Sequence, residues 1–376
     1  MKAIRKIAAM TAAAMTVGAL TAGWMSASTL GAETEAEKAG AFSAWTEGAA
    51  SLDALTSFME DITDENSENY IPVEDRIATF DFDGTLYGEL APNYFEYMML
   101  YHRIMDDPSY TPTASQIAVA EEIADNTVNG TSYDHLPISH AKAAAEAYAG
   151  MTMEEFDAYV KEYAKTEVDG FDNITYAEFY YQPMIQVIEY LQENDFTVYI
   201  VTGSDRFLSR SIADGVLDIA SNNVIGMDVS LVATGQEYVD GLDYVFSPED
   251  QLVRGDQLLI KNLKTNKVTA IAREIGKKPV LAFGNSSGDT SMLTYTISDN
   301  PYRSESFMLV ADDAERDYAN LEKANGLAEK WESMGYHVIS MKNDFALIYK
   351  EGAVKNPEKA VIFDAYKTSE DSEDAA

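Results

Sequence analysis

The chain has 376 residues, of which 46% are hydrophobic and 11% aromatic, so it can build a large packed core and disorder over most of its length is excluded. It carries 63 acidic and 27 basic residues, a formal net charge of −36, which argues against nucleic acid and anionic membrane surfaces as partners. It contains no cysteine, which excludes disulfides, thiolate zinc sites and cysteine nucleophiles.

The N-terminal segment, residues 1–32, has the pattern of an export signal. Lys2, Arg5 and Lys6 precede an alanine-rich apolar stretch, and small residues suited to cleavage follow up to Ala32. A transmembrane anchor is the alternative, but the threonines and glycines of the stretch make a poor permanent membrane helix. We therefore expect an exported protein, periplasmic or secreted, with no stable membrane anchor after cleavage.

The rest of the chain lies between a polar lead-in, residues 33–48, and an acidic C-terminal tail, residues 351–376, whose last stretch KTSEDSEDAA is expected to be solvated. Five short runs that are apolar on both faces, as buried parallel strands are, alternate with helical patterns. These runs are IATF (77–80), VYIV (198–201), VLAF (280–283), FMLV (307–310) and HVISM (337–341). The alternation predicts an α/β fold with a doubly wound, Rossmann-like parallel sheet.

The first two runs are separated by far more residues than one crossover helix needs. Much of this insert has helical character. In MTMEEFDAYVKEY, for example, Thr152 and Glu155 form a capping box ahead of an apolar helical face. Residues 88–180 are therefore predicted to form a helical cap domain, and residues 49–87 and 181–350 the α/β core.

Two aspartates follow the first apolar run, in ATFDFDGTL. Asp81 lies at the carboxyl end of the strand, where open α/β sheets bind ligands, and Asp83 lies two residues further on. Gly84 allows the chain to turn tightly. Two neighbouring carboxylates repel each other, so the pair is suited to Mg²⁺, a hard cation that takes oxygen ligands. An acidic turn is the structural alternative, whereas a calcium-binding loop is excluded because a strand precedes the motif.

The second apolar run leads into VYIVTGSDRF. Thr202 ends the strand, and Gly203 is expected to lead into a helix whose first amides can bind a phosphate oxygen. Arg210, further along this helix, is a candidate for binding an anionic group of the substrate, with a surface position as the alternative. Substrate choice is expected to come from the insert and from the loop after the first motif, including Glu89.

Two more segments bear groups suited to phosphate chemistry. Lys267 lies at the start of an amphipathic helix, and Lys264 is a competitor for the same role. The segment VLAFGNSSGDTSML delivers Asn285 and Asp289 on a glycine-bounded loop at the carboxyl end of a strand. Oxygen ligands on this loop would complete a magnesium site begun by the two aspartates of the first motif.

In this order and context, the four motifs resemble those of the haloacid dehalogenase superfamily of phosphohydrolases. DFDGT matches the first motif, Thr202 the second, Lys267 the third and the GNSSGD loop the fourth. The phosphoserine-phosphatase-like branch is the most similar, because it too has a helical cap between its first and second motifs. The resemblance covers roughly residues 45–350 and implies an aspartyl-phosphate mechanism.

The resemblance also implies a role for each matching residue. Asp81 would attack phosphorus as the nucleophile, and Asp83 would protonate the leaving oxygen, then deprotonate water. Thr202 would bind the phosphoryl oxygens, while Lys267 and Mg²⁺ would offset the negative charge. The expected activity is Mg²⁺-dependent hydrolysis of a small phosphorylated metabolite.

One position departs from the pattern of the superfamily. Asn285 stands where many members have an aspartate, which removes one negative charge from the site. The metal ligands are predicted to be Asp81, Asp83, Asn285 and Asp289. Either of the last two contacts the metal directly, and the other orients it from outside.

A serine esterase is an alternative from another reaction class. GNSSG fits G-x-S-x-G with Ser286 as the nucleophile, and Asp312 or Asp313 and then His337 follow in the order of an esterase triad. This hypothesis leaves the two aspartates of the first motif unexplained. A third hypothesis is a non-catalytic binding protein on the same fold.

Overall fold

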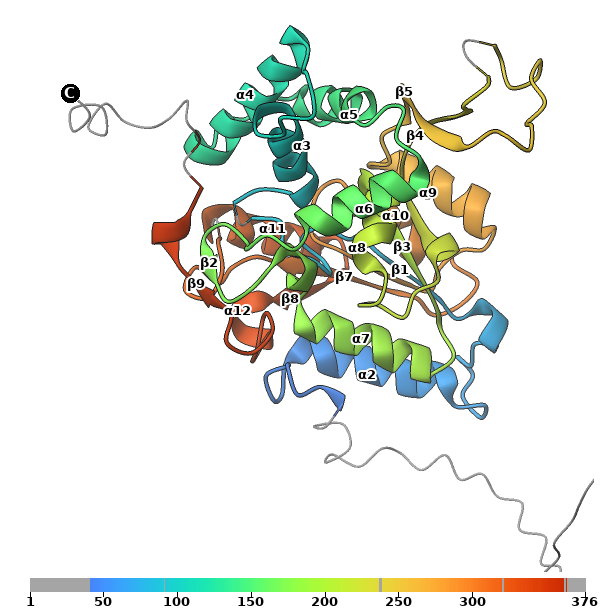
Figure 1. Cartoon of the computed structure of the whole chain (residues 1–376). Helices are drawn as coiled ribbons and strands as arrows, with labels where there is room; N and C mark the ends of the chain where they lie inside the picture. The colour runs from blue at the N-terminus through green and yellow to red at the C-terminus, as the bar shows by residue number, and fades with distance from the viewer. Residues whose placement is uncertain (1–40, 91, 237–238, 320, 362, 364–376) are drawn as a thin grey trace, which may run out of the picture.

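The structure is a computed structural model, and it describes residues 41–363 apart from residues 91, 237–238, 320 and 362 (Figure 1). The predicted signal peptide and the first half of the predicted lead-in lie outside the described residues. The end of the predicted acidic tail, residues 364–376, does so as well. Among the helices of the described part, none has both the length and the apolar character needed to cross a membrane.

A central sheet organises the core. The strands of the described part are β1 (Ile77–Phe80), β2 (Phe171–Asp172), β3 (Thr197–Asp205), β4 (Val224–Ala233), β5 (Leu252–Ile260), β6 (Leu281–Gly284), β7 (Glu305–Val310), β8 (His337–Ser340) and β9 (Val354–Lys355). Seven of them form one sheet in the order β5-β4-β3-β1-β6-β7-β8. All neighbours in this sheet are parallel except β4 and β5, which form an antiparallel pair. The predicted α/β fold with a mostly parallel sheet is confirmed.

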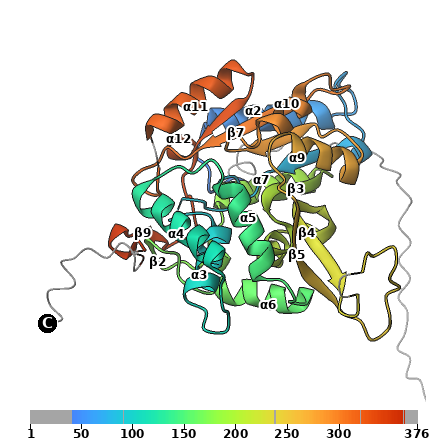
Figure 2. The same cartoon turned by 90° about the horizontal axis from the view of Figure 1, so that it is seen from above.

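Helices cover both faces of this sheet (Figures 1 and 2). The helices of the described part are α2 (Ala50–Thr63), α3 (Phe95–Met105), α4 (Ala114–Asn129), α5 (Leu136–Ala147), α6 (Met153–Tyr163), α7 (Gln182–Glu193), α8 (Arg206–Ala213), α9 (Thr265–Ala270), α10 (Thr290–Ile297), α11 (Leu321–Ser333) and α12 (Met341–Asp344). Leu281 and Phe283 of β6 pack in the same hydrophobic cluster as α2 and α7, whereas Ala282 packs with α9, α10 and α11. Successive side chains of a strand point to opposite faces, so the apolar run is explained by burial on both sides.

All five predicted strands are present. The run IATF coincides with β1, and the other four runs fall on β3, β6, β7 and β8 with small shifts at their ends. The strand β1 lies between β3 and β6. The carboxyl ends of these three strands therefore lie side by side, and the residues that follow them meet at one edge of the sheet.

The insert between β1 and β3 contains helices α3 to α6; α3, α4 and α5 lie together at the top of Figure 1, whereas α6 lies against α8 of the core. The predicted capping box of Thr152 and Glu155 is present at the start of α6, where each side chain bonds the other residue's backbone amide. Helix α5 packs against the β4–β5 pair through Ala141 and Ala145. The insert is thus held against the core on the side of β5.

The described part of the predicted acidic tail packs on the insert, whereas the stretch KTSEDSEDAA, which was predicted to be solvated, lies outside the described residues. Strand β9 pairs with β2 of the insert, and Lys359 forms an ion pair with Asp172. Further on, the ring of Phe363 lies 4.3 Å from that of Tyr101 and packs on α3 and α4. The physical reason is that apolar residues just before the acidic end find a buried surface on the insert. The described part of this segment therefore fastens the insert to the core.

The end of the predicted polar lead-in is also packed rather than solvated. Phe42 and Trp45 are buried in the main hydrophobic cluster. The indole nitrogen of Trp45 donates to the carbonyl of Pro183 at 2.9 Å, and Phe42 packs edge-on against Tyr190. The favourable free energy of burying two aromatic side chains exceeds the cost of desolvating their polar neighbours. This stretch therefore packs into the core.

Candidate active site

The first motif forms a tight turn at the carboxyl end of β1. The amide of Asp81 donates to the carbonyl of Phe283 in the neighbouring strand, so the residue still belongs to the edge of the sheet. Gly84 has a φ of 74°, and a Cβ at this position would lie 1.9 Å from Nδ2 of Asn285. Only glycine fits both the backbone conformation and the space. The turn brings the first motif against the fourth.

A buried lysine joins the two carboxylates at the floor of the site. Nζ of Lys267 lies 2.5 Å from Oδ1 of Asp81 and 2.7 Å from Oδ1 of Asp289, and its side chain is fully buried. Burial alone would lower the pKa of Lys267, but the charges of Asp289 and Asp81 raise that pKa above its usual value. Burial and Asp289 in turn raise the pKa of Asp81, and the lysine opposes both effects. Lys264 is exposed, so the structure brings Lys267 rather than Lys264 to the aspartates.

The second carboxylate of the motif is held by a serine. Oγ of Ser204 donates to Oδ2 of Asp83 at 2.6 Å, and both residues are buried. Burial and the nearby charge of Glu96 raise the pKa of Asp83 to about 7, while the Ser204 hydrogen bond and Lys261 act in the opposite direction. A carboxyl group in this range can both hold and release a proton near neutral pH.

In the loop of the fourth motif, the two predicted metal ligands, Asn285 and Asp289, differ in their hydrogen bonds. Both carboxylate oxygens of Asp289 are occupied: Oδ1 accepts from Lys267, and Oδ2 accepts from the amides of Asn285 and Ser286 and from the hydroxyl of Ser286. Oδ1 of Asn285 is buried and has no hydrogen-bond partner among the described residues. A buried oxygen without a partner is costly, and a cation would satisfy it.

The fit to a magnesium ion can be tested on these groups. Within the described residues, no three side chains of histidine, cysteine, aspartate or glutamate converge on one point. The oxygen donors that line the cavity here are instead the carboxyl groups of Asp81 and Asp83 and the amide oxygen of Asn285. This set fits Mg²⁺, which binds few protein oxygens and keeps several waters. Asp289 is suited to orient the loop and not to contact the ion.

Comparison of the sequence with known protein families identifies the family of the chain. The family model of haloacid dehalogenase-like hydrolases matches residues 78–294, more than half of the chain, and this range contains all four motifs. The chain belongs to the haloacid dehalogenase-like hydrolase family. The predicted superfamily is thus confirmed for this hydrolase.

Solved structures similar to the hydrolase were also found. A conserved protein of unknown function from Anaerococcus prevotii has a TM-score of 0.47 and 14% identity, covering 84% of this chain and 97% of that chain. A phosphoserine phosphohydrolase-like protein from Francisella tularensis has a TM-score of 0.37 and 14% identity, covering 70% and 94%. Cytosolic 5'-nucleotidase IIIB bound to cytidine has a TM-score of 0.41 and 10% identity, covering 76% and 84%. Among curated proteins, no sequence matches the chain.

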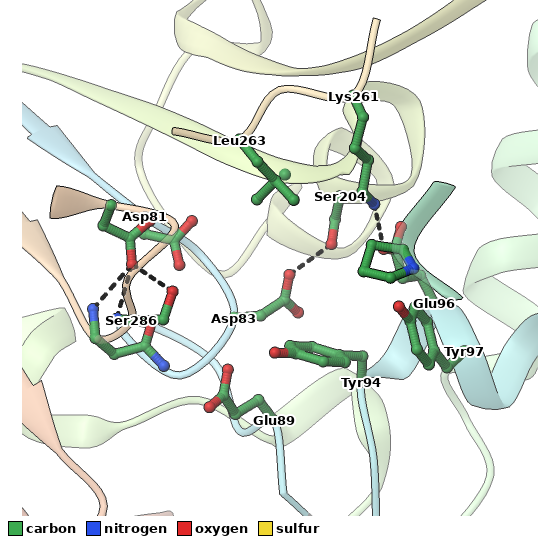
Figure 3. A pocket seen from close by; sticks show the side chains of 14 residues that line it. Asp81, Asp83, Glu89, Tyr94, Glu96, Tyr97, Ser204, Lys261, Leu263 and Ser286 are labelled. Carbon is green, nitrogen blue, oxygen red and sulfur yellow. Dashed lines mark hydrogen bonds and ion pairs between the residues drawn. The ribbon is translucent and has the colours of Figure 1, made fainter. Parts of the chain in front are cut away.

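The side chains of Asp81 and Asp83 line a cavity of about 110 Å³ between core and insert (Figure 3). Gly203 and Glu89, two of the predicted substrate-binding residues, line it. Glu89 is half-buried and accepts a hydrogen bond from Asn285; burial raises its pKa to about 8, and Asp83 and Asp81 add to this effect. A carboxyl group with a pKa in this range is largely protonated near neutral pH, and a cation beside it would favour its ionised form.

Two predictions about the second motif differ from the structure. Gly203 and the residues after it lead into α8, which begins at Arg206, but Thr202 does not end the strand, because β3 continues to Asp205. Thr202 is buried and is not part of the cavity lining; its Oγ1 accepts from the amide of Ser204. Arg210 does not reach the cavity at all. Its guanidinium donates to the carbonyl of Val224 and lines a separate cavity at the other end of α8, because the helix carries this side chain away from the motif.

Sequence reasoning missed several residues of the site. Lys261 at the end of β5 and Glu96 of α3 form a buried ion pair of 3.0 Å on the wall of the cavity, and Glu96 also accepts from the amide of Asp205. The other wall residues that were missed are Tyr94, Tyr97, Pro137, Ser204 and Leu263. Tyr94 and Glu96 follow the first motif closely in the sequence, and this position could have suggested them as site residues. Sequence position does not show, however, whether a side chain points into the cavity.

The structure does not form the esterase triad. The hydroxyl of Ser286 donates to Asp289, while His337 begins β8, stacks on Phe307 and pairs with Glu305 at 3.1 Å. Since β6 and β8 are parallel members of one sheet, a residue that begins β8 lies at the edge opposite to one that follows β6. Asp312 and Asp313 bond Ser340 and Arg316 instead. The esterase hypothesis is therefore wrong.

Proposed function

We propose that the protein is a magnesium-dependent phosphomonoester hydrolase that acts through an aspartyl-phosphate. The observation that carries this proposal is the arrangement of Asp81, Asp83 and Lys267: a buried carboxylate in contact with an ammonium, beside a second carboxyl group suited to proton transfer. An unperturbed aspartate is ionised near neutral pH and needs no base to become a nucleophile, and the contact with Lys267 favours the ionised form of the buried Asp81. A non-catalytic binding protein would have no use for this pair.

Asp81 is proposed to attack the phosphorus atom of the substrate. Its carboxylate oxygen forms a bond to phosphorus while the ester P–O bond breaks, which gives an acyl phosphate on the protein. Lys267 offsets the charge that would otherwise repel an incoming phosphate, and its two carboxylate partners hold it in one position. The acyl phosphate is then hydrolysed by water to free phosphate and the original carboxylate.

Asp83 is proposed to transfer the protons of both steps. It donates a proton to the leaving oxygen in the first step and accepts one from the attacking water in the second. The hydrogen bond from Ser204 fixes one oxygen of this carboxyl group, which leaves the other directed to the cavity. Asp83 is therefore the acid and base, and Ser204 is a positioning residue.

Magnesium is proposed to be held by Asp81, the backbone carbonyl of Asp83 and the amide oxygen of Asn285. When bound, it supplies positive charge for the phosphoryl oxygens. The unsatisfied amide oxygen of Asn285 is the observation that supports this assignment. The compact cavity supports a small phosphorylated substrate, since it is below the range of about 300–1,000 Å³ that drug-sized ligands occupy.

The test of this function is turnover of p-nitrophenyl phosphate with magnesium and with a chelator. We expect hydrolysis that falls by about 100-fold or more when the chelator is present and returns when magnesium is added in excess. A short p-nitrophenyl ester of a carboxylic acid is the matched control and should not be cleaved above background. Phosphatase activity that persists in the chelator would contradict the proposed metal dependence, and no activity on any phosphomonoester would reject the function.

Removal of the Ser204 hydroxyl tests the positioning of Asp83. Ser204→Ala is expected to lower kcat about tenfold with little change in KM, because a hydrogen bond to a charged group is lost at the acid and base. Ser209→Ala is the control, since its buried hydroxyl bonds only the carbonyl of Asp205. Steady-state kinetics on p-nitrophenyl phosphate measure kcat and KM for the two variants. Equal losses in the two variants would show a structural effect and count against the proposed role.

We also propose that the protein is exported. The support is the basic and apolar pattern of residues 1–32, which precede the described part of the chain. Comparison of the N-terminus of the mature protein from the cell envelope or medium with the encoded sequence tests this proposal.

A further inference from the structure

The half of the cavity beyond the reacting carboxylates would receive the leaving group. Its wall consists of the loop after β1, two helices of the insert and the segment after β5. The residues that contribute to it are Glu89, Tyr94, Glu96, Tyr97, Pro137, Lys261 and Leu263. Figure 3 shows Tyr94 and Glu89 directed to the same space as Asp83. The chemistry of these side chains therefore selects the alcohol part of the ester.

The charges of this wall favour a cation. The residues that line the cavity include five carboxylates and a single lysine: Asp81, Asp83, Glu89, Glu96 and Asp289 against Lys261. Lys261 is committed to Glu96 at 3.0 Å, with both side chains more than nine-tenths buried. Lys267 beneath the floor is shared by Asp81 and Asp289. A leaving group with a carboxylate or a second phosphate would meet like charges without a free cation of the lining to receive it.

Histidine does not change this balance. His140 packs behind the wall, where its ring lies 4.2 Å from that of Tyr97, and burial lowers its pKa to about 4. Its Nε2 meets the backbone carbonyl of Glu96, so it serves as a neutral support. His140 therefore adds no positive charge to the wall near neutral pH.

The aromatic residues supply a second attraction for a cation. Tyr94 is half-buried, and its ring centroid lies 5.2 Å from that of Tyr97 with the two planes tilted by 59°. Tyr94 also lies close to Glu89 (Figure 3). A carboxylate beside an aromatic face is a combination that binds ammonium groups, because the charge and the ring quadrupole both attract a cation.

We infer that the substrate is the phosphate monoester of an amino alcohol, with its primary or quaternary ammonium between Glu89 and the ring of Tyr94. This inference rests on the proposed phosphatase function and adds the substrate class. The reaction cleaves the P–O bond of the ester, the alcohol oxygen takes a proton from Asp83, and the ammonium group is unchanged. Water then releases phosphate from Asp81.

A panel of matched esters tests this inference on the magnesium-loaded protein. Phosphocholine and phosphoethanolamine are the cationic members, 3,3-dimethylbutyl phosphate is the neutral counterpart of the same shape as phosphocholine, and 3-phosphoglycerate is the anionic member. We expect kcat/KM for a cationic member to exceed that for the neutral counterpart by about tenfold or more, and the anionic member to be the poorest substrate. The two cationic members distinguish a quaternary from a primary ammonium.

The outcomes separate this inference from the function on which it rests. If p-nitrophenyl phosphate is hydrolysed but the cationic esters are equal to or worse than the neutral one, the substrate class is wrong and the phosphatase function stands. If neither p-nitrophenyl phosphate nor any member of the panel is hydrolysed, the function itself is rejected.

Two variants at one position test the role of the aromatic face. In Tyr94→Leu, the ratio of kcat/KM for phosphocholine to that for 3,3-dimethylbutyl phosphate is expected to fall by about fivefold to tenfold. Tyr94→Phe keeps the ring and is the matched control, so it should retain most of the ratio. Because each ratio is measured within one preparation, a partly unfolded variant does not affect it. An unchanged ratio in Tyr94→Leu would overturn the assignment.

Discussion

Replacement of Asp81 by asparagine is expected to lower kcat on p-nitrophenyl phosphate by about 10⁴-fold or more. The amide has the same shape and can still accept the hydrogen bond from Lys267, but it cannot attack phosphorus. The variant should also fail to retain label after acid quenching with a radiolabelled phosphomonoester, whereas the wild-type protein should retain it as an acyl phosphate. Both measurements address the nucleophile directly.

The control for this substitution is Asp195→Asn. Asp195 is exposed and has a φ of 61°, a backbone conformation that asparagine tolerates well. Its activity and labelling should equal those of the wild-type protein. The thermal midpoint of Asp81→Asn should not fall, because one member of a repelling carboxylate pair has become neutral. Substantial turnover or persistent label in Asp81→Asn would show that another residue is the nucleophile.

Replacement of Lys267 by methionine is expected to affect both activity and stability. Loss of the buried ammonium leaves Asp81 and Asp289 without a counter-charge, which is expected to lower the free energy of unfolding by about 3 kcal/mol. Loss of the positive charge beside the phosphoryl group should lower kcat by roughly 10²- to 10³-fold in the folded fraction. Urea unfolding in magnesium-free buffer and kinetics with magnesium measure the two effects.

Lys264→Met is the matched control for this variant. Lys264 lies three residues earlier and is exposed, so its replacement should change the free energy of unfolding by less than about 0.5 kcal/mol and leave kcat unchanged. Comparison of the two variants also shows whether Lys264 or Lys267 is the lysine that offsets the negative charge of the site, a choice that the sequence left open. Equal effects of the two substitutions would contradict the placement of Lys267 at the floor of the site.

The reactive groups of the site were predictable because their positions depend on neighbours in the chain. A run that is apolar on both faces can only be a buried strand, so IATF and VLAF could be placed within a residue of β1 and β6. The residues that follow such strands must lie at the carboxyl edge of the sheet, which places Asp81, Asp83 and Asn285 together. The same local logic predicted the capping box of α6.

The failed predictions concern solvent exposure and side-chain direction. Phe363 and Trp45 belong to segments that were predicted as an acidic tail and a polar lead-in, yet each is buried against a distant part of the fold. Arg210 follows the second motif closely, but the rotation of α8 directs it to another cavity. Composition averages over a segment, whereas burial is decided by the few apolar side chains that find a partner surface.

The sequence by itself thus determined the class of fold, the family and the groups that react, because strand burial and the order of motifs are properties of adjacent residues. The tertiary structure alone decided which buried oxygen has no hydrogen-bond partner in the described part of the chain and which side chains line the cavity. Lys261 and Glu96 meet across 165 residues of chain, and no local pattern encodes such a contact. Pairing of this kind follows from the packing of the insert on the core, and this packing made the substrate wall acidic and aromatic.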